Sequence, residues 1–168
     1  MFVILFGLPG SGKSFVGDLL QADFDFWFHE GDDDIPADYR QQVLVGRVVG
    51  EPMRDDYHRH LIDRIAELQR AHRRLAVAAP LLRDRHSQWL RARFPQALFI
   101  LVHCRPDAWE TRLQRRTHTI SLDYARKVAS LNEPVTVPYV VLDDSADGPD
   151  GIREQIRTIL KNDGIAQS

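Results

Sequence analysis

Apolar stretches alternate with amphipathic stretches along the whole chain. The apolar stretches are short and rich in β-branched and aromatic residues, which is typical of strands in a buried parallel sheet. They cover residues 2–6, 24–29, 75–79, 98–102 and 139–142. Between them, apolar residues recur every three or four positions and predict helices at about 14–22, 84–94, 106–113, 121–131 and 152–160. This alternation predicts an α/β fold, a three-layer α/β/α arrangement around a parallel five-stranded sheet.

The longest helical pattern lies between the second and third expected strands, at about residues 36–72. It is interrupted at residues 50–52, and its second part places four apolar residues on one helix face: Tyr57, Leu61, Ile65 and Leu68. An insert between two strands can form a helical substrate-binding flap. A plain crossover connection is the alternative interpretation.

A glycine-rich motif follows the first strand. Residues 7–14 read GLPGSGKS, which matches G-x-x-x-x-G-K-[ST] between an apolar strand and a helical pattern. Gly10 and Gly12 allow successive backbone N–H groups to turn toward phosphate oxygens, and the following helix adds the positive end of its dipole. Lys13 can reach the β- and γ-phosphates, and the Ser14 hydroxyl can coordinate Mg²⁺. The motif predicts a P-loop NTPase fold that binds ATP and Mg²⁺.

The residues that we expect to bind the nucleotide extend over this loop, the start of the next helix and one later arginine. They are Gly7, Pro9, Gly10, Ser11, Gly12, Lys13, Ser14, Phe15 and Arg112. Lys13 is also expected to be catalytic, because it can neutralise the charge of the transferring phosphoryl group.

An acidic segment, residues 30–34, comes directly after the second expected strand. Open α/β sheets bind their ligands beyond the carboxyl ends of the strands. We expect Asp32 to bind the phosphate acceptor, to orient or deprotonate its hydroxyl group, and to help hold the metal together with Ser14. Asp34 is a second substrate-binding candidate and the alternative to Asp32 as the base.

Arginines at several positions are candidates for binding anionic groups. Arg112 and Arg116 are four positions apart and share one helix face. Phosphoryl transfer needs cations that neutralise charge, and a mobile lid often carries them. We therefore expect Arg116 to be catalytic and a short lid to cover about residues 115–135. Arg54 and Arg83 are candidates for binding an anionic group on the acceptor.

Composition narrows the remaining choices. The chain has 168 residues, which fits a single domain over residues 1–168. A net charge of −2 and a pI near 6.4 argue against a broad basic surface for nucleic acid, so a small molecule is the expected partner. Cys104 is the only cysteine, which excludes an internal disulfide and fits a reducing, cytoplasmic location. There is no apolar run of about 18 residues, so we expect no membrane-spanning segment.

Shorter motifs are spread over the rest of the chain. They are Glu30-Gly31-Asp32, Gly50-Glu51-Pro52-Met53 with Asp55, Leu81 and Arg83 with Leu90-Arg91, Arg112-Leu113 with Arg116 and His118, and Leu131-Asn132-Glu133-Pro134. With the P-loop, these motifs give the chain a resemblance to the small P-loop metabolite kinases. It is most similar to the gluconate kinases and more distantly similar to the shikimate kinases.

The resemblance implies an enzyme that transfers the γ-phosphoryl group of ATP to a hydroxyl group of a small metabolite, with gluconate or a related sugar acid as the first candidate. It also implies a homodimer. Four substrate-side positions differ from the family pattern: Ile35 replaces a histidine, Gly46 a basic residue, Ala79-Pro80 a small hydroxyl residue, and Leu82 a lysine. These differences leave open a kinase for a shikimate-like acid, a nucleoside or a nucleotide. A nucleotide-binding regulatory protein without transfer activity is the third interpretation.

Overall fold

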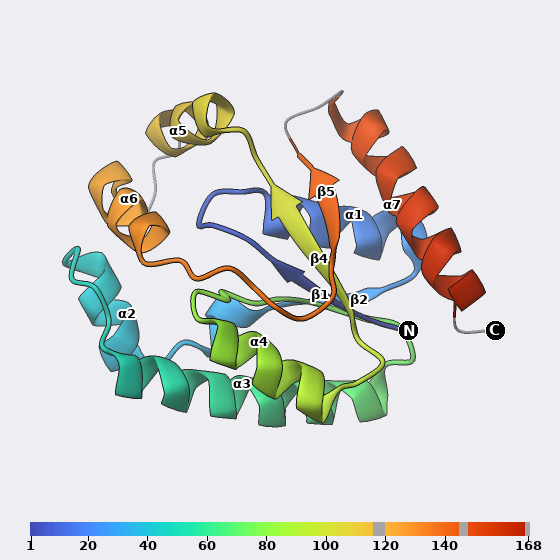
Figure 1. The fold of residues 1–168 in the computed structure, drawn as a ribbon, viewed down its shortest axis with the longest axis horizontal. Helices are drawn as coiled ribbons and strands as arrows, with labels where there is room; N and C mark the ends of the chain where they lie inside the picture. Colours follow the sequence, from blue (N-terminus) through green and yellow to red (C-terminus); the bar gives the residue numbers. More distant parts are fainter. Residues whose placement is uncertain (116–119, 145–147, 167–168) are drawn as a thin grey trace.

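The computed structural model describes residues 1–115, 120–144 and 148–166. Its centre is a sheet of five parallel strands in the spatial order β2-β3-β1-β4-β5 (Figure 1). The strands are β1 (Phe2–Phe6), β2 (Trp27–Glu30), β3 (Leu75–Ala78), β4 (Leu98–His103) and β5 (Val140–Asp143). All residues of the central strand β1 are buried, because helices cover both faces of the sheet.

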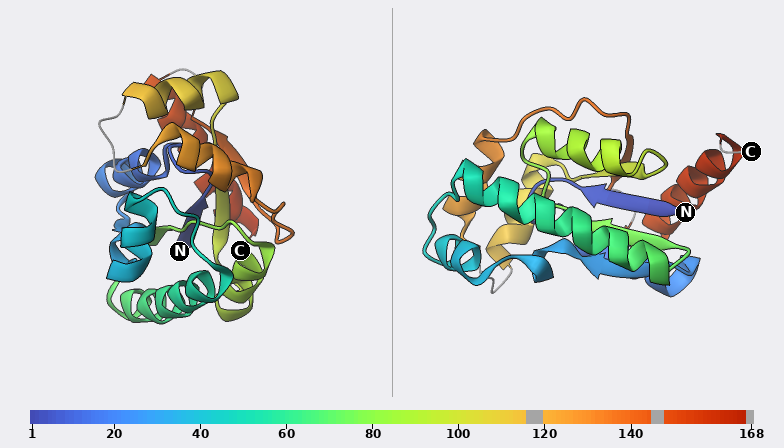
Figure 2. Two further views of the ribbon diagram at one scale, coloured as in Figure 1. Left: turned by 90° about the vertical axis from the view of Figure 1, so that its left-hand side faces the viewer. Right: turned by 90° about the horizontal axis from the view of Figure 1, so that it is seen from below.

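Two helices pack on each face of the sheet. α1 (Lys13–Phe24) and α7 (Gly148–Ala166) cover one face, where Leu20 and Ile156 meet Leu5 of β1. α3 (Glu51–Ala71) and α4 (Asp84–Arg93) run side by side across the other face (Figure 2) and bury Leu61 and Leu90 against the alternate residues of β1. The expected three-layer α/β/α fold with a parallel five-stranded sheet is therefore confirmed.

The remaining helical segments lie beyond the carboxyl ends of the strands, where open α/β sheets bind ligands (Figure 1). They are the 3-10 turn η1 (Gly31–Asp34), α2 (Ala37–Leu44), α5 (Pro106–Arg115) and α6 (Leu122–Ser130). Ser121 caps α6 as expected, because its side chain accepts a hydrogen bond of 3.2 Å from the backbone N–H of Tyr124. None of the helices within the described residues is long and apolar enough to cross a membrane.

Two expected boundaries were wrong. The predicted strand at 24–29 starts later, because α1 continues to Phe24 and Asp25 ends it in the left-handed conformation (φ 60°). The break in the long helical pattern lies at residues 45–50 rather than 50–52. Pro52 belongs to the first turn of α3, where its missing N–H breaks no hydrogen bond of the helix.

A stacked pair of histidines joins α3 to α4. The rings of His58 and His86 lie 3.7 Å apart with an angle of 11° between their planes, and both side chains are buried. His58 Nδ1 donates to the carbonyl oxygen of Arg54 (2.8 Å), and His86 Nε2 donates to Asp55 Oδ1 (2.7 Å). Burial, followed by the neighbouring His86, lowers the pKa of His58 to about 3. Burial also lowers the pKa of His86, against the opposing effect of Asp55.

We expect this pair to make the fold sensitive to acid. The unfolded chain takes up a proton at His58 below pH 6.5, whereas the folded protein does so only near pH 3, so stability falls between these values as the pH is lowered. The expected loss is about 1.4 kcal/mol per pH unit. His58→Asn removes this titration. Urea unfolding at pH 7 and pH 5 should therefore show a smaller loss of unfolding free energy in the variant than in the wild type.

His60→Asn is the matched control. His60 is on the same helix and makes the same bond to the carbonyl four residues earlier (2.8 Å to Asp56), but its side chain is exposed. The control should lose as much stability as the wild type. Equal losses in the wild type and in His58→Asn would contradict the interpretation.

Candidate active site

The loop between β1 and α1 turns at three glycines with positive φ angles, 145° at Gly7, 81° at Gly10 and 105° at Gly12. A Cβ atom on Gly12 would lie 1.8 Å from Oδ2 of Asp144, and one on Gly10 would lie 2.9 Å from Cδ2 of Leu113. The backbone of the loop therefore lies directly against α5 and the end of β5. Any side chain at Gly12 would displace this contact.

α5 packs against the loop, and the hydroxyl group of one loop residue, Ser11, has no hydrogen-bond partner among the described residues. Nε1 of Trp109 donates to the carbonyl oxygen of Pro9 (2.6 Å). The Ser11 side chain is buried, and its Oγ has no hydrogen-bond partner among the described residues. Ser11 lines a cavity between the loop and α5, together with Leu8, Cys104 and Trp109.

Lys13 and Ser14 start α1 next to the end of β2. Lys13 Nζ donates to the carbonyl oxygens of Gly7 and Leu8, both at 3.1 Å. Ser14 Oγ donates to Oε2 of Glu30 at 2.5 Å, and burial raises the pKa of the Glu30 carboxyl. The hydroxyl and the carboxylate form a pair of oxygen donors at the P-loop. Mg²⁺ in phosphoryl-transfer sites takes one or two such protein ligands along with phosphate oxygens, so these residues fit the ion.

Arg112 and Asp144 form an ion pair beside the glycine loop. Nη1 of Arg112 contacts Oδ2 of Asp144, and Nη2 donates to the Asp144 carbonyl oxygen at 2.7 Å. The Asp144 side chain is 3% exposed and that of Arg112 is 34% exposed. Arg112 borders the P-loop at Gly12, where its Nη1 lies 3.4 Å from the position that a Cβ atom would occupy.

A cavity of about 210 Å³ opens between the P-loop and the helical insert. Gly7, Leu8, Pro9 and Lys13 line it from the P-loop, and Asp32 lines it from η1. Residues from α2, α3, α6 and the segment after β3 complete the wall. The structure thus brings Lys13 and Asp32 to one cavity. Asp34 is not part of its lining and instead contacts His29, with 2.7 Å between Oδ2 and Nε2.

Arg54 reaches the same cavity from the first turns of α3. It is 3% exposed, and its Nε donates to the carbonyl oxygen of Val49 at 2.9 Å. Its Nη2 has no hydrogen-bond partner among the described residues. A buried guanidinium group with an unpaired nitrogen is costly unless an anion satisfies it. Of the two arginines predicted to bind the acceptor, Arg54 is the one whose geometry fits that role.

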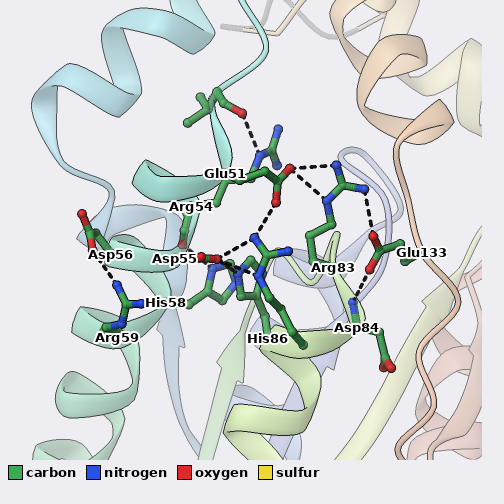
Figure 3. A network of polar contacts seen from close by, with 12 residues as sticks. Glu51, Arg54, Asp55, Asp56, His58, Arg59, Arg83, Asp84, His86 and Glu133 are labelled. Atoms are coloured by element: carbon green, nitrogen blue, oxygen red, sulfur yellow. Dashed lines mark hydrogen bonds and ion pairs between the residues drawn. The ribbon is translucent and has the colours of Figure 1, made fainter.

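Arg83 belongs to a network of charged side chains between α3, α4 and the segment after α6 (Figure 3). Its Nη2 and Nε donate to Glu51 Oε1 at 2.7 and 3.0 Å, and its Nη1 donates to the Leu131 carbonyl at 2.6 Å and to Glu133 Oε1 at 3.2 Å. These contacts with Arg83, and then Arg85, lower the pKa of Glu51 to about 2. Arg83 is not part of the cavity lining.

The remaining predicted residues are spread around this centre. Phe15 lies on α1 and is 37% exposed. Arg116 and His118, together with part of the predicted lid at 115–135, lie outside the described residues.

Four side chains at the site were missed by sequence reasoning as functional residues. They are Glu30, Tyr39, Arg40 and Tyr124. Glu30 had a usable signal, since it begins the acidic segment that follows the second expected strand. The two tyrosines fit an ordinary apolar helix face in the sequence, and nothing in it distinguishes them from core residues.

No protein-family model and no curated protein sequence matches this chain. Its structure is similar to that of a gluconokinase from Sinorhizobium meliloti, with a TM-score of 0.82 and 20% identity over 99% of this chain and 95% of that one. It is also similar to a sugar kinase from Janibacter, with a TM-score of 0.82 and 16% identity over 95% of this chain and 94% of that one. The similarity to a shikimate kinase from Aquifex aeolicus has a TM-score of 0.62, with 15% identity over 98% of both chains. The chain therefore has the fold of small P-loop kinases, as the sequence resemblance implied.

The packing at Gly12 makes a testable prediction for nucleotide binding. Gly12→Ala should weaken the binding of an ATP analogue by tenfold or more, because the new Cβ atom displaces Asp144 and Arg112 in addition to straining the backbone. Gly46→Ala is the matched control: Gly46 also has a positive φ (69°), but no atom lies within 4 Å of the added Cβ. It should lose about 1 kcal/mol of stability and no nucleotide affinity.

The measurements are calorimetric titration with the analogue and a melting curve for each variant. Equal analogue affinity in the two variants would show that the contact between Gly12 and Asp144 does not shape the site.

Proposed function

We propose that this protein is an ATP-dependent kinase that transfers the γ-phosphoryl group of ATP to a hydroxyl group of a small metabolite. The observation that carries the proposal is the cavity that the P-loop and Asp32 share. A phosphate held by the loop and an acceptor held beside Asp32 would occupy adjoining parts of one cavity. Such positioning, together with charge neutralisation, is what phosphoryl transfer chiefly needs from a protein.

The P-loop holds the phosphates in this proposal. The backbone N–H groups of Gly10, Gly12, Lys13 and Ser14 donate to phosphate oxygens, and Lys13 Nζ leaves its carbonyl partners to contact the β- and γ-phosphates. Ser14, Glu30 and Asp32 are the residues that would hold Mg²⁺, directly or through water. The bound ion neutralises charge on the β- and γ-phosphates.

Asp32 orients the acceptor and receives its proton. The acceptor oxygen forms a bond to the γ-phosphorus, the bond from that phosphorus to the β,γ-bridging oxygen breaks, and ADP leaves with the electron pair. The proton of the acceptor hydroxyl passes to the Asp32 carboxylate. Arg40 supports this position, because its Nη2 donates to the Asp32 carbonyl oxygen at 3.2 Å. Asp34 is held by His29 and is the weaker candidate for the base.

Two arginines complete the nucleotide side in this proposal. Arg112 borders Gly12 and forms a wall of the nucleotide site. We propose that Arg116, in the segment expected to act as a lid over about 115–135, neutralises charge on the transferring phosphoryl group.

The sequence resemblance and the fold make gluconate or a related sugar acid the first acceptor to test. Shikimate-like acids, nucleosides and nucleotides follow. The test is a coupled assay of ADP release with Mg-ATP and a panel of these acceptors. Strong stimulation by one acceptor supports the proposal and identifies the substrate. Tight ATP binding without stimulation by any acceptor would instead favour a nucleotide-binding regulatory protein.

Lys13→Ala should lower kcat by about 100-fold or more, because it removes a charge that stabilises the transferring phosphoryl group. The fold should stay intact, since the Lys13 side chain is not part of the apolar core. The measurement is kcat with the stimulating acceptor, alongside a melting curve. Lys161→Ala, at an exposed position of α7, is the control and should retain wild-type turnover. Turnover of Lys13→Ala within threefold of the wild type would contradict the role.

Asp32→Asn should lower kcat by about 100-fold or more while it changes the dissociation constant of ATP little, because a proton acceptor is lost and the shape is kept. Steady-state kinetics and titration with an ATP analogue give the two values. Asp33→Asn, at the exposed neighbouring position, serves as the control. Asp34→Asn tests the alternative base. Near-normal turnover of Asp32→Asn with a large loss in Asp34→Asn would reassign the base to Asp34.

A further inference from the structure

The cavity wall that faces away from the P-loop is mostly apolar. Its apolar residues come from the segment after η1, from α2, from the segment after β3, and from α6 with the residue that precedes it: Ile35, Val43, Leu81, Leu82, Ile120 and Val128. Leu82 and Val128 belong to one buried cluster with Tyr124. A ligand hydroxyl that is buried against such a wall loses its hydrogen bonds to water and gains no hydrogen bond to the protein. Each hydroxyl left unpaired therefore weakens binding.

Exposed aliphatic residues at the end of α2 extend the apolar surface of the cavity wall. Leu44, at the end of α2, lines the cavity and is 49% exposed, and the following Val45 is 56% exposed. Exposed aliphatic side chains at the rim of a pocket gain free energy when an apolar ligand covers them. The rim and the wall therefore favour the same kind of ligand.

One part of the cavity lining can bind an anionic group. Arg54, with its unpaired Nη2, lines the cavity together with Tyr39 and Tyr124, which are 6% and 5% exposed. Neither tyrosine hydroxyl makes a hydrogen bond to another described residue. The Arg54 charge acts on the pKa of both tyrosines, so both rings lie close to it. Burial nevertheless raises the pKa of Tyr39 to about 12, which keeps its hydroxyl a donor at neutral pH.

The polar groups of the cavity lie close to one another. The charges of both Asp32 and Arg54 act on the pKa of each tyrosine. Outside these groups, the lining is mostly aliphatic, with Arg40 and Asn132 as its other polar side chains away from the P-loop. A polyhydroxylated acid would have to bury several hydroxyl groups against this wall without partners, whereas a sparsely hydroxylated acid would not.

We propose that the acceptor is a small carboxylic acid with an apolar carbon skeleton and few hydroxyl groups besides the one that is phosphorylated. Its carboxylate is bound by Arg54, Tyr39 and Tyr124, and its reacting hydroxyl lies at Asp32. The inference rests on the proposed function, since it names the acceptor of that transfer. In the transfer, the acceptor oxygen forms a bond to the γ-phosphorus, ADP leaves, and the hydroxyl proton passes to Asp32.

Two matched pairs of acceptors test the class in the ADP-release assay. 6-Hydroxyhexanoate has the chain length, carboxylate and terminal hydroxyl of gluconate without the four internal hydroxyls, and 3-hydroxycyclohexanecarboxylate is the corresponding partner of shikimate. In at least one pair, the less hydroxylated acid should have a kcat/KM at least tenfold higher. A ratio below tenfold in both pairs would overturn the inference and leave the kinase function standing, as would stimulation by nucleosides alone. If no acceptor stimulates ADP release, both proposals are overturned.

Binding of hexanoate, which has the carboxylate and chain but no hydroxyl, tests the anion site without turnover. Calorimetry should show that hexanoate binds the wild type more tightly than gluconate does. Arg54→Lys and Tyr124→Phe should each weaken hexanoate binding by tenfold or more while the affinity for an ATP analogue stays unchanged. Tyr124→Phe keeps the packing of the ring, so it remains informative if Arg54→Lys melts early.

Arg59→Lys is the matched control, because Arg59 lies on the same helix and its side chain is 61% exposed. It should bind hexanoate like the wild type. Unchanged hexanoate affinity in a folded Arg54→Lys or Tyr124→Phe variant would overturn the assignment of the anion site.

Discussion

The parallel pairing of β1, β3 and β2 is the constraint on which the site depends. Ala78 at the end of β3 pairs with Leu5 on one side and with Glu30 on the other. Because the strands are parallel and end at the same level, the P-loop, the η1 turn and the segment after β3 all leave the sheet at one edge. This is why Ser14 contacts Glu30 and why Lys13 and Asp32 line one cavity. A shift in register would separate the nucleotide side from the acceptor side.

Two arginines that look alike in the sequence meet different environments in the fold. Arg83 is surrounded by carboxylates and a carbonyl, so its hydrogen-bonding capacity is used within the protein (Figure 3). It ties α3 to the segment after α6 and fixes the position of the cavity wall. Arg54 is more deeply buried and keeps a nitrogen without a partner. A protein tolerates that cost where a ligand removes it, so this difference supports Arg54 rather than Arg83 as the arginine of the proposed anion site.

The sequence predicted those parts of the molecule that depend on local chemistry. The glycine loop, the α/β alternation and the Ser121 cap follow from short-range patterns, and each is found in the structure. The position of Asp32 was predictable because the carboxyl ends of parallel strands meet at one edge. Tyr39 and Tyr124 were not, since their helices show ordinary amphipathic spacing. Only the packing of α2 and α6 around Arg54 makes their hydroxyl groups part of a site.

Three of the four positions at which this chain departs from the gluconate kinase pattern lie at the same cavity. Ile35, Pro80 and Leu82 stand where the family has a histidine, a small hydroxyl residue and a lysine, and all three line the cavity. Each change removes a side chain that could pair with a ligand hydroxyl and adds aliphatic surface in its place. The fourth departure, Gly46, is not part of the cavity lining. A loss of function would not require the three cavity changes to share one chemical character while Arg54 stays in place, so these three support the proposal of one altered acceptor.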